Sequence, residues 1–389
     1  MLDEQAILSY LEASGPGLLD LLERLVNIDS FSADKGGVDR AGDVLTAFYQ
    51  SHGIAIQSRR SDTYGDALIA RLGTEARPVL LMGHRDTVFP PGEAGRRPFR
   101  IAGGKATGPG VNDMKAGLAS IALVMAAFRS CCSSPPPLWS LTTGDEELAS
   151  PFSRPIIEEL ADGARVVFNA EPARANGNVV TSRKGGRFML LELEGKAAHA
   201  GVNFFDGASA IHAMAAKIVR LSQATDRRTG TTLNVGLVRG GQTVNTVAPR
   251  AACEIDLRFA SPAARDAAIA HIDAVVAERE IEGVSATLHL KGEFLPMVAT
   301  ERSLALFDLY RTTARDLGVA LDGEFTGSCA DSGFTSARGV PTLCGVGAVG
   351  DGSHTPDEFV HVDTIIPRAK ILALTICRVL AGSHSSPWE

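Results

Sequence analysis

A short apolar run, Val79 to Met82, is followed at once by GHRDTVFP, which places His84 and Asp86 one residue apart. An uninterrupted apolar run of this length is typical of a strand that is buried on both faces of a sheet. In α/β sheets, ligands bind beyond the carboxyl ends of the strands. The run therefore predicts a buried strand that ends by presenting two side chains suited to a metal site.

The surrounding sequence alternates helical and strand patterns. Leucines recur at helical spacing over residues 18–25, and a nearly continuous stretch of small and apolar residues at 114–128 predicts a helix deep in the core. Further short apolar runs occur at residues 138–142 and 166–168. This alternation predicts the α/β fold class, with a mixed, mainly parallel sheet flanked by helices.

The pattern changes near residue 185. From there to residue 293 the order of elements is strand, helix, strand, strand, helix, strand, which is the order of a ferredoxin-like α+β unit. We therefore expect an inserted domain of residues 185–293 within a larger domain made of residues 1–184 and 294–389. His354 would then belong to the returning half of the larger domain.

Composition excludes several classes of partner. The 389 residues carry a formal net charge of -7, which argues against a nucleic-acid partner, because phosphate binding needs clustered basic residues. No window comes close to the roughly 18 apolar residues of a membrane span, and the opening MLDEQAIL does not resemble a secretory signal. Six cysteines without framework spacing suggest reduced thiols. We expect a cytoplasmic protein with neither a nucleic-acid nor a membrane partner.

More acidic and imidazole residues lie in strand-end or loop contexts. They are Asp113 in GPGVNDMKAG, Glu146 and Glu147 in TTGDEELAS, Glu171 in NAEP, and His354 in GDGSHTPDE. Carboxylates together with imidazoles suit Zn²⁺, and one carboxylate can bridge two ions in hydrolytic sites. Asp113 is the best candidate for that bridge. A neighbouring carboxylate can accept the proton of a water whose pKa the ions lower to about 7, and in the Glu-Glu pair one side chain can bind metal while the other acts as this base.

Simpler interpretations exist for each residue taken alone. Glu146 and Glu147 could be acids at the start of a helix, and Asp86 could cap a turn. His84 and His354 could each be an isolated structural histidine. The joint occurrence of the motifs in order favours the metal site.

The motifs also resemble a known family. GHRDTVFP, GPGVNDMKAG, TTGDEELAS, NAEP, GKAAHAG and GSHTPDEFV are similar, in order, to those of the di-zinc metallopeptidase family of bacterial glutamate carboxypeptidase (carboxypeptidase G) and aminoacylase. The resemblance implies two zinc ions per chain, for which Co²⁺ or Mn²⁺ could substitute. It implies His84 and Glu171 on one ion, Glu147 and His354 on the other, and Asp113 bridging them.

The resemblance implies roles for other residues as well. Glu146 would be the general base, and Asp86 would orient His84 through the second ring nitrogen. The peptide bond between Asp113 and Met114 would be cis. In the inserted domain, His199 of AAHAG would stabilise the oxyanion in the partner subunit, which implies a homodimer formed through that domain.

Two further residues of the inserted domain resemble substrate-binding positions. Arg258 of DLRF and Asn245 of GGQTVNTV would hold the carboxylate and backbone of the substrate. Simpler interpretations again exist: Arg258 could pair with Asp256 or Glu254, Asn245 could make a turn, and His199 could be a surface histidine.

We therefore expect zinc-dependent hydrolysis of an amide bond that releases a C-terminal amino acid, plausibly glutamate, from N-acyl or peptidyl substrates. A metal-bridging water would attack, with Glu146 as the base. The loop GSCADSGF departs from the family pattern and bears on the substrate. The alternatives are an aminoacylase or N-acyl amino acid deacylase with other side-chain specificity, and a catalytically silent zinc-binding relative.

Overall fold

The computed structural model describes residues 2–74, 77–382 and 386–388. The chain forms two compact units. The larger consists of Met1–Ser182, Ala299–Phe325 and Phe334–Glu389, and the smaller of Arg183–Val298 and Thr326–Gly333. Three segments differ from the division expected from sequence, because residues 183–184, residues 294–298 and Thr326–Gly333 belong to the smaller unit.

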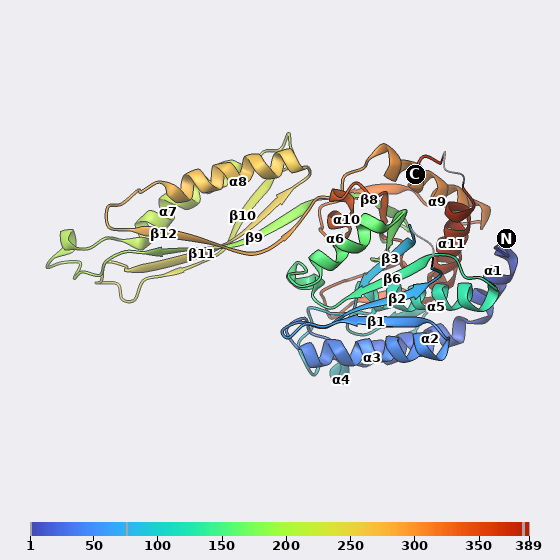
Figure 1. Ribbon diagram of the computed structural model, residues 1–389. Coiled ribbons are helices and arrows are strands. Elements are labelled where there is room, and N and C mark those ends of the chain that lie inside the picture. Colours follow the sequence, from blue (N-terminus) through green and yellow to red (C-terminus); the bar gives the residue numbers. More distant parts are fainter. Residues whose placement is uncertain (1, 75–76, 383–385, 389) are drawn as a thin grey trace. The chain divides into compact units, whose positions relative to one another are not determined.

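The larger unit is built on an eight-stranded mixed sheet in the order β1-β2-β6-β3-β7-β14-β8-β13 (Figure 1). The four central strands β6, β3, β7 and β14 are parallel, whereas β1, β2 and β8 join antiparallel. The bounds are β1 (Ala55–Arg59), β2 (Ala67–Leu72), β3 (Val79–His84), β6 (Leu138–Thr143), β7 (Val166–Asn169), β8 (Val179–Arg183), β13 (Gly323–Thr326) and β14 (Thr342–Cys344). Every residue of β3 and β7 is buried, which matches their apolar sequence.

Helices flank this sheet, as predicted (Figure 1). They are α1 (Glu4–Ala13), α2 (Gly15–Val26), α3 (Lys35–Ser51), α4 (Glu93–Arg96), α5 (Ala116–Cys131), α6 (Arg154–Gly163), α9 (Glu301–Asp316), α10 (Ser332–Ala337) and α11 (Val362–Ala381). The helix α5 packs against β3 and β6 on one side and against α1, α2 and α11 on the other. Its position explains its sequence, since a helix covered all round can be apolar all round.

The sequence expectation that no segment could span a membrane needs one correction. By length and composition, Val111–Cys131 is long and apolar enough to do so. In the structure, 94% of its most apolar window is buried inside the protein. The segment is therefore the central helix of the larger unit's core.

A second, small sheet of the larger unit has the order β15-β16-β5-β4. Its strands are β4 (Arg100–Ala102), β5 (Lys105–Thr107), β15 (Gly350–Asp351) and β16 (Phe359–His361). All the pairings are antiparallel. The sheet thus joins the segment before α5 to the segment that carries His354.

The smaller unit has the predicted order of elements. They are β9 (Gly185–Glu194), α7 (Ala210–Leu221), β10 (Thr232–Gly240), β11 (Arg250–Phe259), α8 (Pro262–Ala277) and β12 (Ser285–Phe294), with short 3-10 turns at Phe204–Asp206 and Ser222–Ala224. The strands form an antiparallel sheet in the order β10-β11-β9-β12. Both helices pack on this sheet over a separate apolar core (Figure 1). The predicted fold class is confirmed in both units.

Candidate metal centre

Three adjacent parallel strands bring most of the acidic residues to one edge of the large sheet. Strand β3 lies between β6 and β7, and it ends at His84, whose partner in β6 is Thr143. Glu146 follows β6 at the start of a 3-10 turn, Glu146–Leu148, and Glu171 follows β7 by two residues. The carboxyl ends of neighbouring parallel strands lie side by side, so these side chains converge without a long loop.

Asp113 and His354 reach the same place from other elements. Asp113 lies in the irregular turn Val111–Lys115 that precedes α5, and its peptide bond to Met114 is cis, as predicted. His354 lies between β15 and β16 and has a positive φ of 65°, an uncommon conformation for a residue other than glycine.

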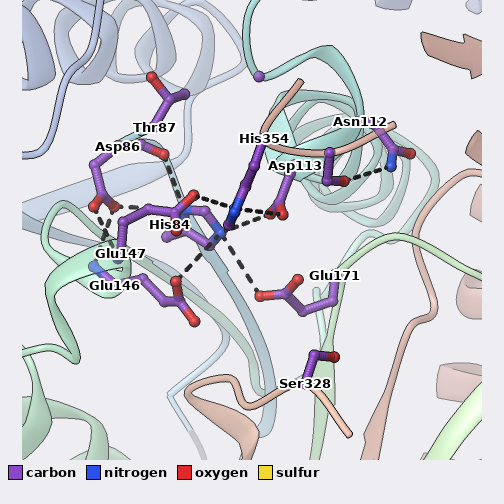
Figure 2. A network of polar contacts seen from close by, with 12 residues as sticks. His84, Asp86, Thr87, Asn112, Asp113, Glu146, Glu147, Glu171, Ser328 and His354 are labelled. Carbon is purple, nitrogen blue, oxygen red and sulfur yellow. Dashed lines mark hydrogen bonds and ion pairs between the residues drawn. The ribbon is translucent and has the colours of Figure 1, made fainter. Parts of the chain in front are cut away.

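Six side chains form one cluster, the metal centre (Figure 2): His84, Asp113, Glu146, Glu147, Glu171 and His354. His84 Nε2 lies 3.1 Å from Asp113 Oδ1, 3.7 Å from Glu171 Oε1 and 3.9 Å from Glu146 Oε2. His354 Nε2 lies 3.4 Å from Asp113 Oδ2 and 3.2 Å from Glu147 Oε1. Asp113 therefore faces both imidazoles, one with each carboxylate oxygen.

Asp86 organises the strand ends behind this cluster. Its carboxylate is fully buried and accepts hydrogen bonds from the backbone N–H groups of Glu146 at 3.2 Å and Glu147 at 3.1 Å (Figure 2). It also accepts a hydrogen bond from Ser32 Oγ at 2.7 Å and lies 3.4 Å from His84 Nδ1. The same side chain therefore contacts the imidazole at the end of β3 and the turn after β6.

Glu358 plays a comparable part for Asp113, and the sequence reasoning missed it. This buried carboxylate accepts hydrogen bonds from the backbone N–H groups of Gly110, Asn112 and Asp113 at 2.8 to 2.9 Å. Burial, together with the charge of Asp113, raises the pKa of Glu358 to about 7. The available signal was its position four residues after His354 in the same motif.

The four carboxylates of the cluster carry negative charge that the two histidines do not balance while they are neutral. Burial alone would lower the pKa of His84, but the charge of Glu146 and the contacts with Asp113 and Asp86 raise it well above its usual value. Contacts with Asp113 and Glu147 raise the pKa of His354 to about 10. The two imidazoles thus attract protons strongly, as expected where carboxylates surround a place for cations.

The donor set fits divalent metal ions. Two groups of three residues each place their ligand atoms within 4.8 Å of one another. One group is His84, Asp113 and Glu147, and the other is His84, Glu146 and Glu171. Oxygen and imidazole nitrogen are ligands that Zn²⁺ accepts. Glu146 therefore lies close enough to serve as a ligand as well as the predicted base.

The remaining predicted residues lie in the smaller unit. His199 and Asn245 are exposed and adjacent, since the N–H of Ala200 donates to the carbonyl of Asn245 at 2.9 Å. Arg258 is held by Asp256 through two hydrogen bonds of 2.7 and 2.9 Å, which is the simpler interpretation given for it above. The Nη1 atom of Arg258 also contacts Cys329 Sγ at 2.7 Å.

The larger unit is an α/β unit with a cluster of carboxylates and imidazoles beside its strand ends, and the α+β unit interrupts its sequence. This arrangement suits a metal-dependent hydrolase. Residues 80–378 match the model of peptidase family M20/M25/M40. The chain belongs to this family, and with it to the hydrolases.

The names of the relatives describe different substrates. The chain is 27% identical to carboxypeptidase G2 of Pseudomonas sp. (strain RS-16), over 94% of this chain and 90% of that protein. It is 25% identical to acetylornithine deacetylase of Proteus mirabilis, over 93% and 96%. Among solved structures, it resembles the Bacillus subtilis YXEP protein, described as a dinuclear metal binding peptidase of family M20, with a TM-score of 0.68 and 14% identity, over 95% and 100%.

Proposed function

We propose that this protein is a di-zinc amidohydrolase that releases a C-terminal amino acid from an N-acyl or peptidyl substrate. The observation that carries the proposal is the cluster of four carboxylates and two imidazoles beside the strand ends, with Asp113 facing both imidazoles. The dinuclear description of the YXEP protein supports two ions. The names of the relatives support hydrolysis of an amide bond next to an amino acid.

The distances suggest how the residues divide between two ions. His84 and Glu171 would hold one, His354 and Glu147 the other, and Asp113 would bridge both. When bound, the ions would polarise the substrate carbonyl and make the attacking water more acidic. Asp86 would keep His84 in the tautomer whose Nε2 is available as a ligand.

Glu146 is the proposed general base. Its backbone N–H is fixed by Asp86, and its carboxylate lies beside the cluster in a buried position. It would accept a proton from the attacking water and return it to the leaving nitrogen. A relative that only binds its ligand would need no such carboxylate.

The identity of the released amino acid separates the two leading alternatives. Glutamate release resembles what the name carboxypeptidase G2 describes, whereas deacylation of another amino acid resembles the deacetylases. Arg258 would hold the substrate carboxylate only by exchanging one of its contacts with Asp256 or Cys329. Sequence identity does not separate the two, because carboxypeptidase G2 and an N-acetyl-L-citrulline deacetylase are each 27% identical to this chain over 94% of its length. The substrate panel of the activity test decides between glutamate release and deacylation of another amino acid.

We also propose a homodimer formed through the smaller unit. Strand β10 is at one end of its sheet and exposes Leu237 and Val238, each at 59% of its surface. Ile211 and Val219, about two turns apart on α7, are also exposed. Exposed apolar residues along an unpaired strand favour association with a second chain. In such a dimer, His199 would serve the partner subunit as an oxyanion donor.

Light scattering tests the dimer. Val238→Lys on β10 should yield monomers, because a charge would be buried at the interface. Ser285→Lys, on the strand at the opposite end of the same sheet, is the matched control and should remain a dimer. A monomeric wild type would refute the homodimer.

The activity test compares amino acid release from N-acyl and dipeptide substrates, with zinc content measured alongside. Wild type should hold about two zinc ions per chain. Glu146→Gln should keep zinc and lose activity, whereas Glu23→Gln, an exposed residue of α2, should keep both. Zinc without hydrolysis of any substrate by wild type would favour a catalytically silent relative.

A further inference from the structure

A cavity of the larger unit, of about 530 Å³, is rich in positive charge. Its walls include Arg96, Arg97, Arg100, Lys105, Thr107 and Phe359. None of the six metal-centre residues lines it. Its volume is within the range of pockets that bind small molecules.

The register of the small sheet explains why the cationic residues gather there. Arg100 of β4 and Phe359 of β16 both pair with Thr107 of β5, so all three side chains emerge on the same face. Lys105 lies two residues before Thr107 and shares that face. The ammonium group of Lys105 lies 3.7 Å from the centre of the Phe359 ring, which holds it over the sheet.

The charges of the cavity are incompletely balanced. Glu93 pairs with both Arg96 and Arg97, and Asp357 is the acidic residue of the cavity wall. Four cationic side chains against these two carboxylates leave a local charge of +2, in a chain whose net charge is -7. Among the described residues, Arg100 makes no side-chain hydrogen bond or ion pair.

Arg97 is fixed in place and still has an unused donor. Its Nε contacts Glu93, its Nη1 donates to the carbonyl of Pro356 at 2.8 Å, and its guanidinium lies 4.8 Å from the centre of the Phe89 ring. Its Nη2 is buried and has no hydrogen-bond partner among the residues that the structure describes. A buried donor without a partner is costly, and a small shift of the Arg97 guanidinium toward an anion in the cavity would relieve that cost.

We propose that this cavity binds a small dianion of the phosphate class. A single carboxylate is satisfied by one arginine, whereas a compact group with two charges and several acceptor oxygens can use donors that converge from two arginines, a lysine and a hydroxyl. Arg97, which follows α4, and Arg100 and Lys105 of the small sheet supply the charged donors. Thr107 would add its hydroxyl by giving up the 3.5 Å hydrogen bond that it donates to the carbonyl of Arg100. Phe359 and the two prolines of the wall offer apolar surface for the rest of an organic phosphate.

The cavity shares a segment of chain with the metal centre. Pro356, which accepts the hydrogen bond from Arg97, lies two residues after His354. Asp357 lines the cavity, and the next residue, Glu358, holds the backbone of Asp113. An anion that attracts Arg97 and repels Asp357 would therefore act on the segment that positions His354. This second part of the inference rests on the proposed metal centre.

Calorimetric titration with inorganic phosphate tests the site, using zinc-loaded protein and chloride at matched ionic strength as the reference. Arg100→Gln/Lys105→Gln should weaken binding by about tenfold or more, because two charge-assisted contacts are lost. Arg60→Gln/Arg315→Gln is the matched control. It removes the same charge from two exposed arginines of the same unit that form no ion pair with any residue the structure describes, and it should bind like wild type.

Three results would overturn the site. The first is wild type that binds no phosphate. The second is an affinity for phosphate in the Arg100→Gln/Lys105→Gln protein equal to that of wild type. The third is an equal loss of affinity in both double variants. The second of these would place phosphate at the metal centre, and the third would indicate a general charge effect.

The link to the metal centre is read from the rate at which zinc is released to a chromophoric chelator. Phosphate at a concentration that occupies most of the wild type but little of Arg100→Gln/Lys105→Gln should change this rate at least about fivefold in wild type and little in the variant. The same rate in wild type with and without phosphate would refute the link. If the purified protein cannot bind zinc, the proposed function fails, while the phosphate titration still decides the cavity.

Discussion

Substitution of Asp86 by asparagine tests how the strand ends are held together. Asp86→Asn keeps the shape of the side chain but exchanges one acceptor oxygen for an NH₂ group. Oδ1 accepts from the N–H of Glu146, and Oδ2 accepts from the N–H of Glu147 and from Ser32 Oγ. The hydroxyl of Ser32 can rotate to become an acceptor, but a backbone N–H cannot. Either orientation of the new amide therefore leaves one backbone donor facing another donor.

The expected magnitude follows from that single mismatch. Asp86 is fully buried, so the N–H group that loses its partner has no access to water. A buried donor without a partner costs about 1–3 kcal/mol, which is the expected loss in the free energy of unfolding. Burial alone would raise the pKa of Asp86, but the contacts with His84 and Ser32 lower it, so the side chain is charged at neutral pH. The affinity for zinc should fall by about tenfold, because Nδ1 of His84 loses the charge of the carboxylate at 3.4 Å but keeps the backbone carbonyl of Asp86 at 3.0 Å.

Two assays on the same preparations measure these effects. Thermal unfolding of the metal-free protein gives the stability change without any contribution from zinc, and competition with a chelator gives the zinc affinity. Asp43→Asn, at an exposed position of α3, makes the same chemical change and should behave like wild type in both assays. If Asp86→Asn matches wild type in stability and zinc affinity, the idea that Asp86 holds the strand ends is wrong.

Two other measurements follow from the structure. Burial alone would raise the pKa of Glu293, but Arg265 and Arg187 lower it. The ionised Glu293 therefore stabilises the fold above the pKa of the unfolded state, and this stabilisation is lost as the pH falls through the lower pKa of the folded state. Glu293→Gln should therefore destabilise the smaller unit by about 1–2 kcal/mol at pH 7. Urea unfolding at pH 7 and pH 3 should show a smaller difference in stability from wild type at the lower pH. An equal difference at both pH values would contradict this prediction. Removal of zinc by a chelator should abolish hydrolysis and lower the melting temperature, since a ligand at 100 times its Kd stabilises by about 2.7 kcal/mol, and full activity after chelation would exclude a metal-dependent reaction.

The fold could be predicted from local patterns because its central elements are long or strongly apolar. The run at Val79 to Met82 became a fully buried strand, and the strand and helix order of the smaller unit was read from periodicity. Segment Thr326–Gly333 was assigned to the wrong unit, because its contacts with residues 183–298 are distant in sequence and leave no local pattern.

The candidate site was predictable for a related reason. Metal-competent residues at strand ends must lie in short motifs directly after apolar runs, and these are visible in a single sequence. The contacts that hold the site in place are harder to predict. Glu358 accepts a backbone N–H bond from Asp113, and Ser32 donates its hydroxyl to Asp86, in both cases across more than fifty positions of the chain. The position of Glu358 in the motif of His354 was visible in the sequence, but its partners were not.

Arg85, between two residues with assigned roles, shows how little adjacency in sequence says about function. Its guanidinium is fully buried and donates to the carbonyls of Val38, Thr142 and Thr143 at 2.9 to 3.2 Å and to that of Asp66. Lysine cannot reach all of these acceptors from one nitrogen, so Arg85→Lys should destabilise the metal-free protein by about 2–5 kcal/mol. Zinc content of the folded fraction should remain that of wild type, because the hydrogen bonds and ion pairs of the Arg85 side chain go, among the described residues, to partners other than the six metal-centre residues. Loss of zinc from well-folded Arg85→Lys protein would instead make Arg85 part of the site, as Asp86 is argued to be.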